Sequence, residues 1–344
     1  MKASVLEVDG GVAALQEFLH DRGWTDGLPV VPPLEELVEE MLRGAPGPAE
    51  RVIATIAPSL VAATLEKVAI NAVMAGCRSD YLPVIVAAIR AMARPQFNLA
   101  GIQATTHPVA PLIFVNGPIR QRIGLNCAAG ALGQGTRANA TIGRAIRLAL
   151  MNLGGAIPGQ TDMATHGTPC KFSYCMGELE EDSPWAPLHV DAGLRPEDSA
   201  VTVFAAEAPH NVNDHGSQTA PEVLQTIADS MNTAGANNLH LGGEMMLVLG
   251  PEHARILAAG GMSKADVREA LHALLRVRLN RISPSNLERY RTIRPAFVTD
   301  AAEVSYFDKP EQIVVTVAGG AGKHSLVIPG FGSTAIVTER IDTA

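Results

Sequence analysis

The segment PLIFVNG, residues 111–117, decides the fold class. It is a short apolar run, the pattern of a β-strand that is buried on both faces. A glycine-rich loop, GLNCAAGALGQGTR, follows at residues 124–137, and a strong helical pattern, NATIGRAIRLALMNLGG, occupies residues 139–155. Asn139 or Thr141 is placed to cap that helix. A strand, a glycine loop and a helix in succession predict an α/β protein.

The same alternation continues on both sides of this segment. Apolar residues recur at three and four spacing in residues 64–75, which predicts an amphipathic helix. We therefore expect an α/β fold with mixed sheet layers flanked by helices. Further helices are predicted at residues 81–93, 221–235, 250–261 and 263–277, and further strands at residues 200–207, 244–250, 311–320, 325–330 and 333–341.

Two strand segments resemble each other: LIFVNGPIR (112–120) and MLVLGPEHAR (246–255). Each is an apolar strand that ends in Gly-Pro and a charged residue, which fits two related halves or a coincidence. We predict one α/β half at residues 1–160, with the glycine-rich loop, and another at 161–344, with a histidine-rich loop; one compact unit is the alternative. The boundary falls within the long loop region 156–199, and loops of that length in compact proteins are usually functional.

Composition excludes several classes of function. The net charge of −8 argues against a nucleic-acid partner, because phosphate binding needs clustered Lys and Arg. No run of about 18 apolar residues predicts a membrane span, and the N-terminus has no apolar run typical of a secretory signal. Four cysteines in 344 residues form no disulfide scaffold, so we expect a cytoplasmic protein. The low aromatic content and apolar chain favour a homo-oligomer.

The glycine-rich loop is a candidate anion site. Backbone N–H groups at Gly133 and Gly135, with Arg137 and Asn139 at the start of the helix, would bind a carboxylate or phosphate of a small polar substrate. A tight turn that merely lets the helix pack is the alternative. The loop is not G-x-G-x-x-G, and AGGAGKHS (318–325) is not a Walker motif, so the sequence contains no NAD or ATP motif.

The polar loop EAPHNVNDHG, residues 207–216, directly follows a predicted strand, where α/β enzymes bind ligands. It carries His210, His215, Asn213 and Asp214. His107 and His166 are its candidate neighbours. Three interpretations stay open: ligands to a divalent transition metal, acid–base or substrate-binding groups without metal, and a solvated structural loop.

The cysteines admit a reactive or an inert interpretation. Cys170 and Cys175 lie in THGTPCKFSYC, Cys77 ends an apolar helix, and Cys127 lies in the glycine loop. These spacings match no recognised iron–sulfur or thioredoxin-like motif. A thiol becomes a nucleophile when its pKa is lowered by nearby positive charge; buried, inert cysteine is the alternative.

Several long runs resemble an uncharacterised bacterial family whose members accompany small proteins and selenoproteins with a UGSC motif. The resemblance implies a thiol or selenol redox partner and thiol chemistry or reductive cleavage. Cys77 and Cys175 match the family pattern, whereas Cys127 and Cys170 depart from it. The runs that carry the resemblance are GWTDGLPVVPP, EKVAINAVMAGC, TTHPVAPLIFVNGPI, RANATIGRA, SPWAPLHV, PHNVNDHG and LGPEHA.

Three hypotheses for the function follow. The first is a cytoplasmic enzyme or enzyme subunit acting on a small polar or anionic substrate by thiol-assisted C–X cleavage or redox chemistry. In it Cys77 or Cys175 is the thiolate, and His107, His210 or His215 transfers protons. The second is a metal-dependent lyase or hydrolase with His107, His166, His210 and His215 as candidate ligands. The third is a non-catalytic partner subunit of a redox complex.

Overall fold

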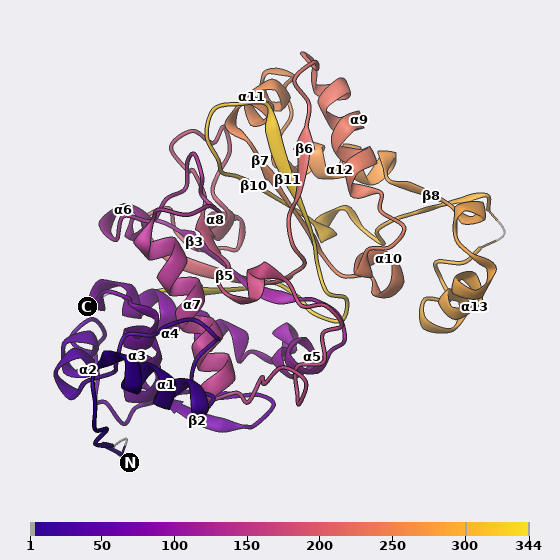
Figure 1. The fold of residues 1–344 in the computed structure, drawn as a ribbon. Coiled ribbons are helices and arrows are strands. Elements are labelled where there is room, and N and C mark those ends of the chain that lie inside the picture. The colour runs from indigo at the N-terminus through magenta and orange to yellow at the C-terminus, as the bar shows by residue number, and fades with distance from the viewer. Residues whose placement is uncertain (1–3, 300, 343–344) are drawn as a thin grey trace.

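The computed structural model describes residues 4–299 and 301–342 and confirms an α/β fold with mixed sheets flanked by helices (Figure 1). The first of two four-stranded sheets has the order β12-β5-β3-β4, and the second has the order β10-β7-β11-β6. The first sheet contains β3 (Ala110–Asn116), β4 (Cys175–Gly177), β5 (Ala200–Ala206) and β12 (Val337–Arg340). The second contains β6 (His210–Asn213), β7 (Met245–Leu249), β10 (Ile313–Val317) and β11 (His324–Pro329).

Central strands are buried on both faces, as predicted for residues 111–117. Every residue of β3, β5 and β7 is buried, and so is every residue of the edge strand β10. Side chains alternate between the two faces of a strand, so both faces of each sheet must be covered. On the facing sides, Leu112 and Phe204 of the first sheet and Met246 and Ile328 of the second belong to one apolar cluster. The two sheets therefore pack face to face.

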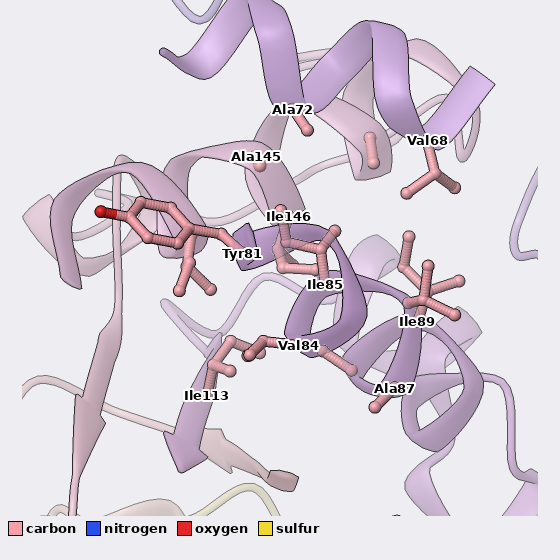
Figure 2. Close-up of a cluster of buried hydrophobic side chains, with 14 of the residues drawn as sticks. Val68, Ala72, Tyr81, Val84, Ile85, Ala87, Ile89, Ile113, Ala145 and Ile146 are labelled. Atoms are coloured by element: carbon pink, nitrogen blue, oxygen red, sulfur yellow. The ribbon is translucent and has the colours of Figure 1, made fainter. Parts of the chain in front are cut away.

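Helices cover the outer face of each sheet and complete four layers. α3 (Leu65–Ala75), α4 (Leu82–Met92) and α7 (Arg137–Asn152) pack outside the first sheet. Figure 2 shows Ile85 and Ile89 of α4 among side chains of α3, α7 and β3. α9 (Ala220–Met231), α11 (Pro251–Ala259) and α12 (Lys264–Leu274) pack outside the second sheet (Figure 1).

The two halves have the same arrangement of strands and helices. In each sheet a parallel pair (β3 with β4, β7 with β10) is followed by an antiparallel strand (β5, β11) and an antiparallel edge strand. α4 packs on β5, β12 and α7, and α9 packs in the same way on β11, β6 and α12. β3 and β7, whose sequences are alike, occupy equivalent places. Their likeness therefore corresponds to a structural repeat.

The halves exchange their last strands. β6 follows β5 in the chain but pairs with β11 of the second sheet, and β12 follows β11 but pairs with β5 of the first. Each sheet is thus completed by a strand from the other half. The predicted boundary near residue 160 does not coincide with the edge of a sheet, because β4 and β5 follow it yet pair with β3.

The two sheets are joined where β5 and β11 meet end to end. Ala206 and Gly330 form an antiparallel bridge, flanked by hydrogen bonds from Glu207 N to Pro329 O at 2.8 Å and from Phe331 N to Ala205 O at 2.9 Å. A Cβ atom at Gly330 would lie 2.2 Å from the carbonyl oxygen of Glu244, so the close approach requires glycine.

The remaining elements surround this framework. Two predictions about local structure were wrong. Residues 210–213 were expected in a loop but form β6, and Asn139 and Thr141 lie inside α7, whose N-cap position is Thr136. No helix within the described ranges combines the length and apolar character that a membrane crossing requires. The other strands are β1 (Val52–Ile56), β2 (Val61–Thr64), β8 (Arg276–Arg278) and β9 (Glu303–Ser305). The other helices are α1 (Val12–Asp21), α2 (Glu35–Leu42), α5 (Leu99–Ala104), α6 (Ile119–Arg122), α8 (Leu188–Asp191), α10 (Asn237–Leu241) and α13 (Pro284–Ile293).

Candidate functional site

A pocket of about 230 Å³ lies where two glycine-rich loops meet, one from each half. Residues 130–132 and 318–322 form its rim, and the apolar side chains of Met176, Val248 and Leu326 contribute to its walls together with His324. It borders the carboxyl ends of the parallel strands β7 and β10, which is where α/β proteins place their ligands.

The first loop is held in place by Asn139, which is buried in α7. Its side-chain oxygen accepts from Asn126 N at 2.9 Å, and its amide nitrogen donates to the carbonyls of Asn126 and Ala131 at 2.8 and 3.0 Å. Three hydrogen bonds from one fixed side chain give the loop a single conformation. Asn139 therefore positions the rim of the pocket instead of binding a ligand there.

The second loop packs closely on the first. Gly319 N donates to the carbonyl of Cys127 at 2.9 Å, and a Cβ atom at Gly320 would lie 2.6 Å from the Cβ of Ala129. Within residues 4–299 and 301–342, the main-chain N–H groups of Gly320 and Ala321 donate to no acceptor. They are free to bind an oxygen atom of a ligand, as amides in glycine-rich loops do.

A pair of histidines stands beside the pocket. His324 is the first residue of β11 and His215 follows β6; their Nε2 atoms are 3.2 Å apart and their rings are inclined by 82°. The Asn211 side-chain amide lies 3.2 Å from Nδ1 of His324. Pairing of β6 with β11 puts Asn211, Asn213 and His324 on one face of the sheet, because Asn213 is opposite His324 and Asn211 opposite Leu326.

Some residues predicted for the site lie at the pocket and others do not. His215 contacts His324, which lines the pocket, and Asn213 is opposite His324 in the strand pairing; Gly133 adjoins the rim through a hydrogen bond to Gly130 O at 2.7 Å. Gly135 is exposed further along the loop, with a φ of +105°. Arg137 is directed away, because its Nε donates to the carbonyl of Gly76 at 2.9 Å.

Asp214 and His324 show opposite errors of the sequence interpretation. Asp214 is buried, and its carboxylate accepts from Ser217 N at 3.1 Å, so it shapes the turn after β6. His324 was not among the predicted site residues. The sequence signal for His324 is the segment AGGAGKHS (318–325), in which a glycine-rich loop leads directly into a strand. A test of that segment for a phosphate-binding motif does not consider its histidine.

The other predicted histidines lie elsewhere. His107 Nε2 donates to the Glu207 carboxylate at 2.8 Å, and its ring stacks on Phe331, beyond the end of β11 opposite to His324. His166 is exposed on a neighbouring loop, since Thr165 N donates to Thr106 O at 2.9 Å. His210 is exposed on β6 but, by strand alternation, faces away from Asn211. These three histidines do not meet His215.

All four cysteines are free, and burial raises the pKa of each thiol. Burial raises the pKa of Cys77 to about 12, against a hydrogen bond with the Thr141 side chain and the charges of Arg137 and Arg144, which lower it. The pKa of Cys175, which is buried on β4, is raised further, first by burial and then by its charge interactions with Cys127 and Cys77. A thiolate is the reactive form, so these surroundings do not activate either thiol.

We expect Cys77 and Cys175 to resist a thiol-specific disulfide reagent at pH 8 in the folded protein. With a pKa near 12, only about one Cys77 thiol in ten thousand is ionised at that pH. Labelling should be followed by mass spectrometry of digests with and without denaturant, and half-buried Cys170 serves as the accessible internal control. Rapid labelling of Cys77 in the folded chain would restore support for the thiol hypothesis.

A buried network of charged residues, not predicted from the sequence, follows β3 and β4. Glu178 is 0% exposed; its Oε2 accepts from Asn116 Nδ2 and Leu188 N, both at 2.7 Å. Arg120 donates to the carbonyl of Glu178 at 2.6 Å and pairs with Glu180 and Glu181. Leu179 N donates to Val317 O at 2.8 Å, so this segment runs beside β10 and next to the pocket.

A larger, open hollow of about 640 Å³ lies between α9 and α11. Two of its charged groups already have partners: Lys323 Nζ donates to Ser217 O at 2.7 Å, and Glu252 accepts from Gly322 N at 2.8 Å. Arg255 also lines the hollow, and among the described residues it has no hydrogen-bond or ion-pair partner. The carboxylate of Glu222 occupies the start of α9, where it accepts from Thr219 N at 3.0 Å. We take the glycine-lined pocket as the candidate site because it borders the carboxyl ends of β7 and β10 and is lined by His324.

In the part of the chain that the structure describes, no three or more His, Cys, Asp or Glu side chains are grouped so as to hold a metal ion together. At this pocket, the side chains with a ligand nitrogen for a metal are the imidazole of His324, which lines it, and that of His215, which contacts His324. Comparison with models of known protein families and with curated protein sequences gives no match.

Proposed function

We propose that the chain is a cytoplasmic enzyme that binds a small polar or anionic organic molecule in the glycine-lined pocket and acts on it with the imidazoles of His215 and His324. The observation that carries the proposal is convergence: residues 130–132 and 318–322 line one pocket with His324, and Asn211 and His215 contact His324 from β6 and the turn after it. The free state of all four thiols supports the assignment to a reducing compartment.

The pocket suits a molecule smaller than a typical drug. Its volume of about 230 Å³ lies below the roughly 300–1,000 Å³ of drug-sized sites. The apolar side chains of Val248 and Leu326 would contact the carbon skeleton, and the amides of Gly320 and Ala321 would bind a carboxylate or phosphate oxygen. Such a molecule would lie with one end against the glycine rim and the other toward His324.

The imidazoles supply the reactive nitrogen atoms at that end. In the metal-free protein, one Nε2 carries a hydrogen and the other accepts it, so a proton can pass between substrate and solvent through the pair. Imidazole is suited to this task because one ring nitrogen can donate a hydrogen while the other accepts one. The thiols of Cys77 and Cys175 take no part in this chemistry, because their burial keeps them protonated.

The test is a search for binding among small carboxylates, phosphates and amides by thermal unfolding. A compound at 100 times its Kd should stabilise the protein by about 2.7 kcal/mol. Replacing Ala321, which is exposed on the rim, with leucine should fill the pocket and weaken binding at least tenfold, or about 1.4 kcal/mol.

Ala259→Leu is the matched control, because Ala259 is exposed on the larger hollow between α9 and α11. It should leave binding unchanged. Binding that is lost in Ala259→Leu and kept in Ala321→Leu would move the site to that hollow. A panel in which nothing stabilises the protein would contradict the proposed function.

A further inference from the structure

We propose that His215 and His324 form a two-histidine site for a divalent transition metal of the zinc, cobalt, nickel and copper group. The inference deepens the proposed function and rests on it only for the role of the metal beside a bound substrate. The site itself is argued from the geometry of the two rings and their surroundings.

The distance between the two nitrogen atoms fits a shared metal. Zinc binds imidazole nitrogen at about 2.0–2.1 Å, and tetrahedral angles then set the two nitrogens about 3.3–3.4 Å apart. The observed distance between Nε2 of His215 and Nε2 of His324 is 3.2 Å. The rings are inclined by 82°, so both can direct a lone pair at one point between them without stacking.

Asn211 supplies the outer support that metal-binding histidines need. In the structure the amide nitrogen Nδ2 of Asn211 lies 3.2 Å from Nδ1 of His324, so Nδ2 donates and Nε2 of His324 carries the ring hydrogen. A half-turn of the amide would bring its oxygen to Nδ1 instead; Nδ1 then donates, and the lone pair on Nε2 is left for a metal. The pairing of β6 with β11 keeps Asn211 beside His324 in either case, because Asn211 is opposite Leu326 and Asn213 opposite His324.

The surroundings leave the other coordination positions to water and substrate. His215 and His324 are both exposed, and His324 lines the pocket. The described residues add no third His, Cys, Asp or Glu ligand. Open positions are the mark of a catalytic metal, which polarises a substrate oxygen or lowers the pKa of bound water. Imidazole suits zinc, copper and nickel, whereas magnesium and calcium prefer oxygen.

The experiment titrates the full chain, stripped of metal with a chelator, with Co²⁺ and Zn²⁺. Calorimetry should give one equivalent of Zn²⁺, and Co²⁺ should give the visible absorption of a nitrogen-ligated ion. His215→Ala and His324→Ala should each weaken binding at least 100-fold. Asn211→Ala should weaken it about 10–100-fold, as expected for an outer-shell partner.

His210→Ala is the matched control, because His210 is exposed on the same strand β6 but faces the other way. It should bind both ions like the unchanged protein. Circular dichroism checks the fold of each variant, and all the replaced residues are exposed. The site is overturned if no equivalent of Zn²⁺ binds, or if His215→Ala and His324→Ala bind it unchanged; the pair is then a hydrogen bond only.

The two proposals fail separately. The search for small-molecule binding uses metal-free protein, and its blocking variant, Ala321→Leu, leaves both imidazoles in place. Zinc binding with no small-molecule binding would leave the metal site and remove the proposed substrate pocket. Small-molecule binding without zinc binding would leave the pocket, with the histidines acting as proton-transfer groups alone.

Discussion

Replacing Arg120 with methionine is expected to lower the free energy of unfolding by about 3–5 kcal/mol, the cost of removing one partner from a buried ion pair. The Arg120 side chain is 5% exposed, and Glu180, its partner at 2.8 Å, is 16% exposed. Methionine fills a similar volume but pairs with neither carboxylate. Glu180 would then be left without this partner in a place that water reaches only in part, whereas Glu181 is 49% exposed and is partly solvated.

The loss comes from the carboxylates that Arg120 leaves behind. Glu178 adds to it through its main chain, because its carbonyl accepts from Arg120 at 2.6 Å and would lose that donor. Burial also acts to raise the pKa of Glu181, but hydrogen bonds from Arg120 outweigh it and the net direction is down. A triple variant that adds Glu180→Gln and Glu181→Gln should therefore recover part of the lost stability.

The stability lost in Arg120→Met should depend on pH, because hydrogen bonds from Arg120 lower the pKa of Glu181. A carboxyl group whose pKa is lowered in the folded state stabilises the protein above its unfolded pKa, about 4.5 for Glu181, and that contribution is lost as the pH falls through the folded value. The difference between Arg120→Met and the unchanged protein should be large at pH 7 and shrink below about pH 4.5. Urea unfolding at several pH values measures it.

Arg195→Met is the control, since Arg195 also pairs with two carboxylates but is 68% exposed. Exposed ion pairs contribute about 0–1 kcal/mol, so this variant should unfold almost like the unchanged protein. Equal losses in both variants would mean that burial is not what makes the Arg120 network matter.

Much of the fold could be predicted because strand and helix periods are written in local sequence. Residues 111–117 and 244–250 are apolar runs of strand length, and they form the central strands β3 and β7. β6 was missed because Asn211 and Asn213 make an edge strand look like a loop. The exchange of β6 and β12 could not be predicted, since the choice of sheet depends on tertiary packing and not on local pattern.

The candidate site was predictable only in pieces. The glycine loop and the polar loop each carry a local signal, but the sequence does not show that His215 meets His324, 109 positions further along the chain. The Cys77 and Cys175 hypothesis rested on residue type, whereas their reactivity depends on a burial that only the fold reveals. The buried network of Arg120 and Glu178 could not be predicted either, because charged residues are expected on the surface.

Ending the chain at Ile336, which removes β12, is expected to destabilise the first half of the molecule even though β12 lies at the end of the second. Val337 and Ile341 are 6% and 4% exposed and belong to the core beneath α3, α4 and α7. Losing two buried aliphatic side chains at about 1.5–3 kcal/mol each gives a loss of roughly 3–6 kcal/mol. Urea unfolding measures the size of this loss, and amide hydrogen exchange shows which strands and helices lose protection.

The strand exchange determines where the protein should open. Without β12, β5 becomes an edge strand, and the hydrogen bond between the hydroxyls of Thr202 and Thr338 is lost. Amides of β5 and α4, which pack on β12, should exchange faster than those of β7 and α12. Glu339→Gln with Asp342→Asn, which removes the pairs with Arg94 and Arg90 but keeps the strand, should cost less than about 1 kcal/mol per pair. If the two halves were independent, removing β12 would lower protection in the second sheet, which contains β7 and β11. Because the halves exchange strands, the loss should fall on the first sheet. Faster hydrogen exchange confined to β7 and β11 would therefore contradict the strand exchange.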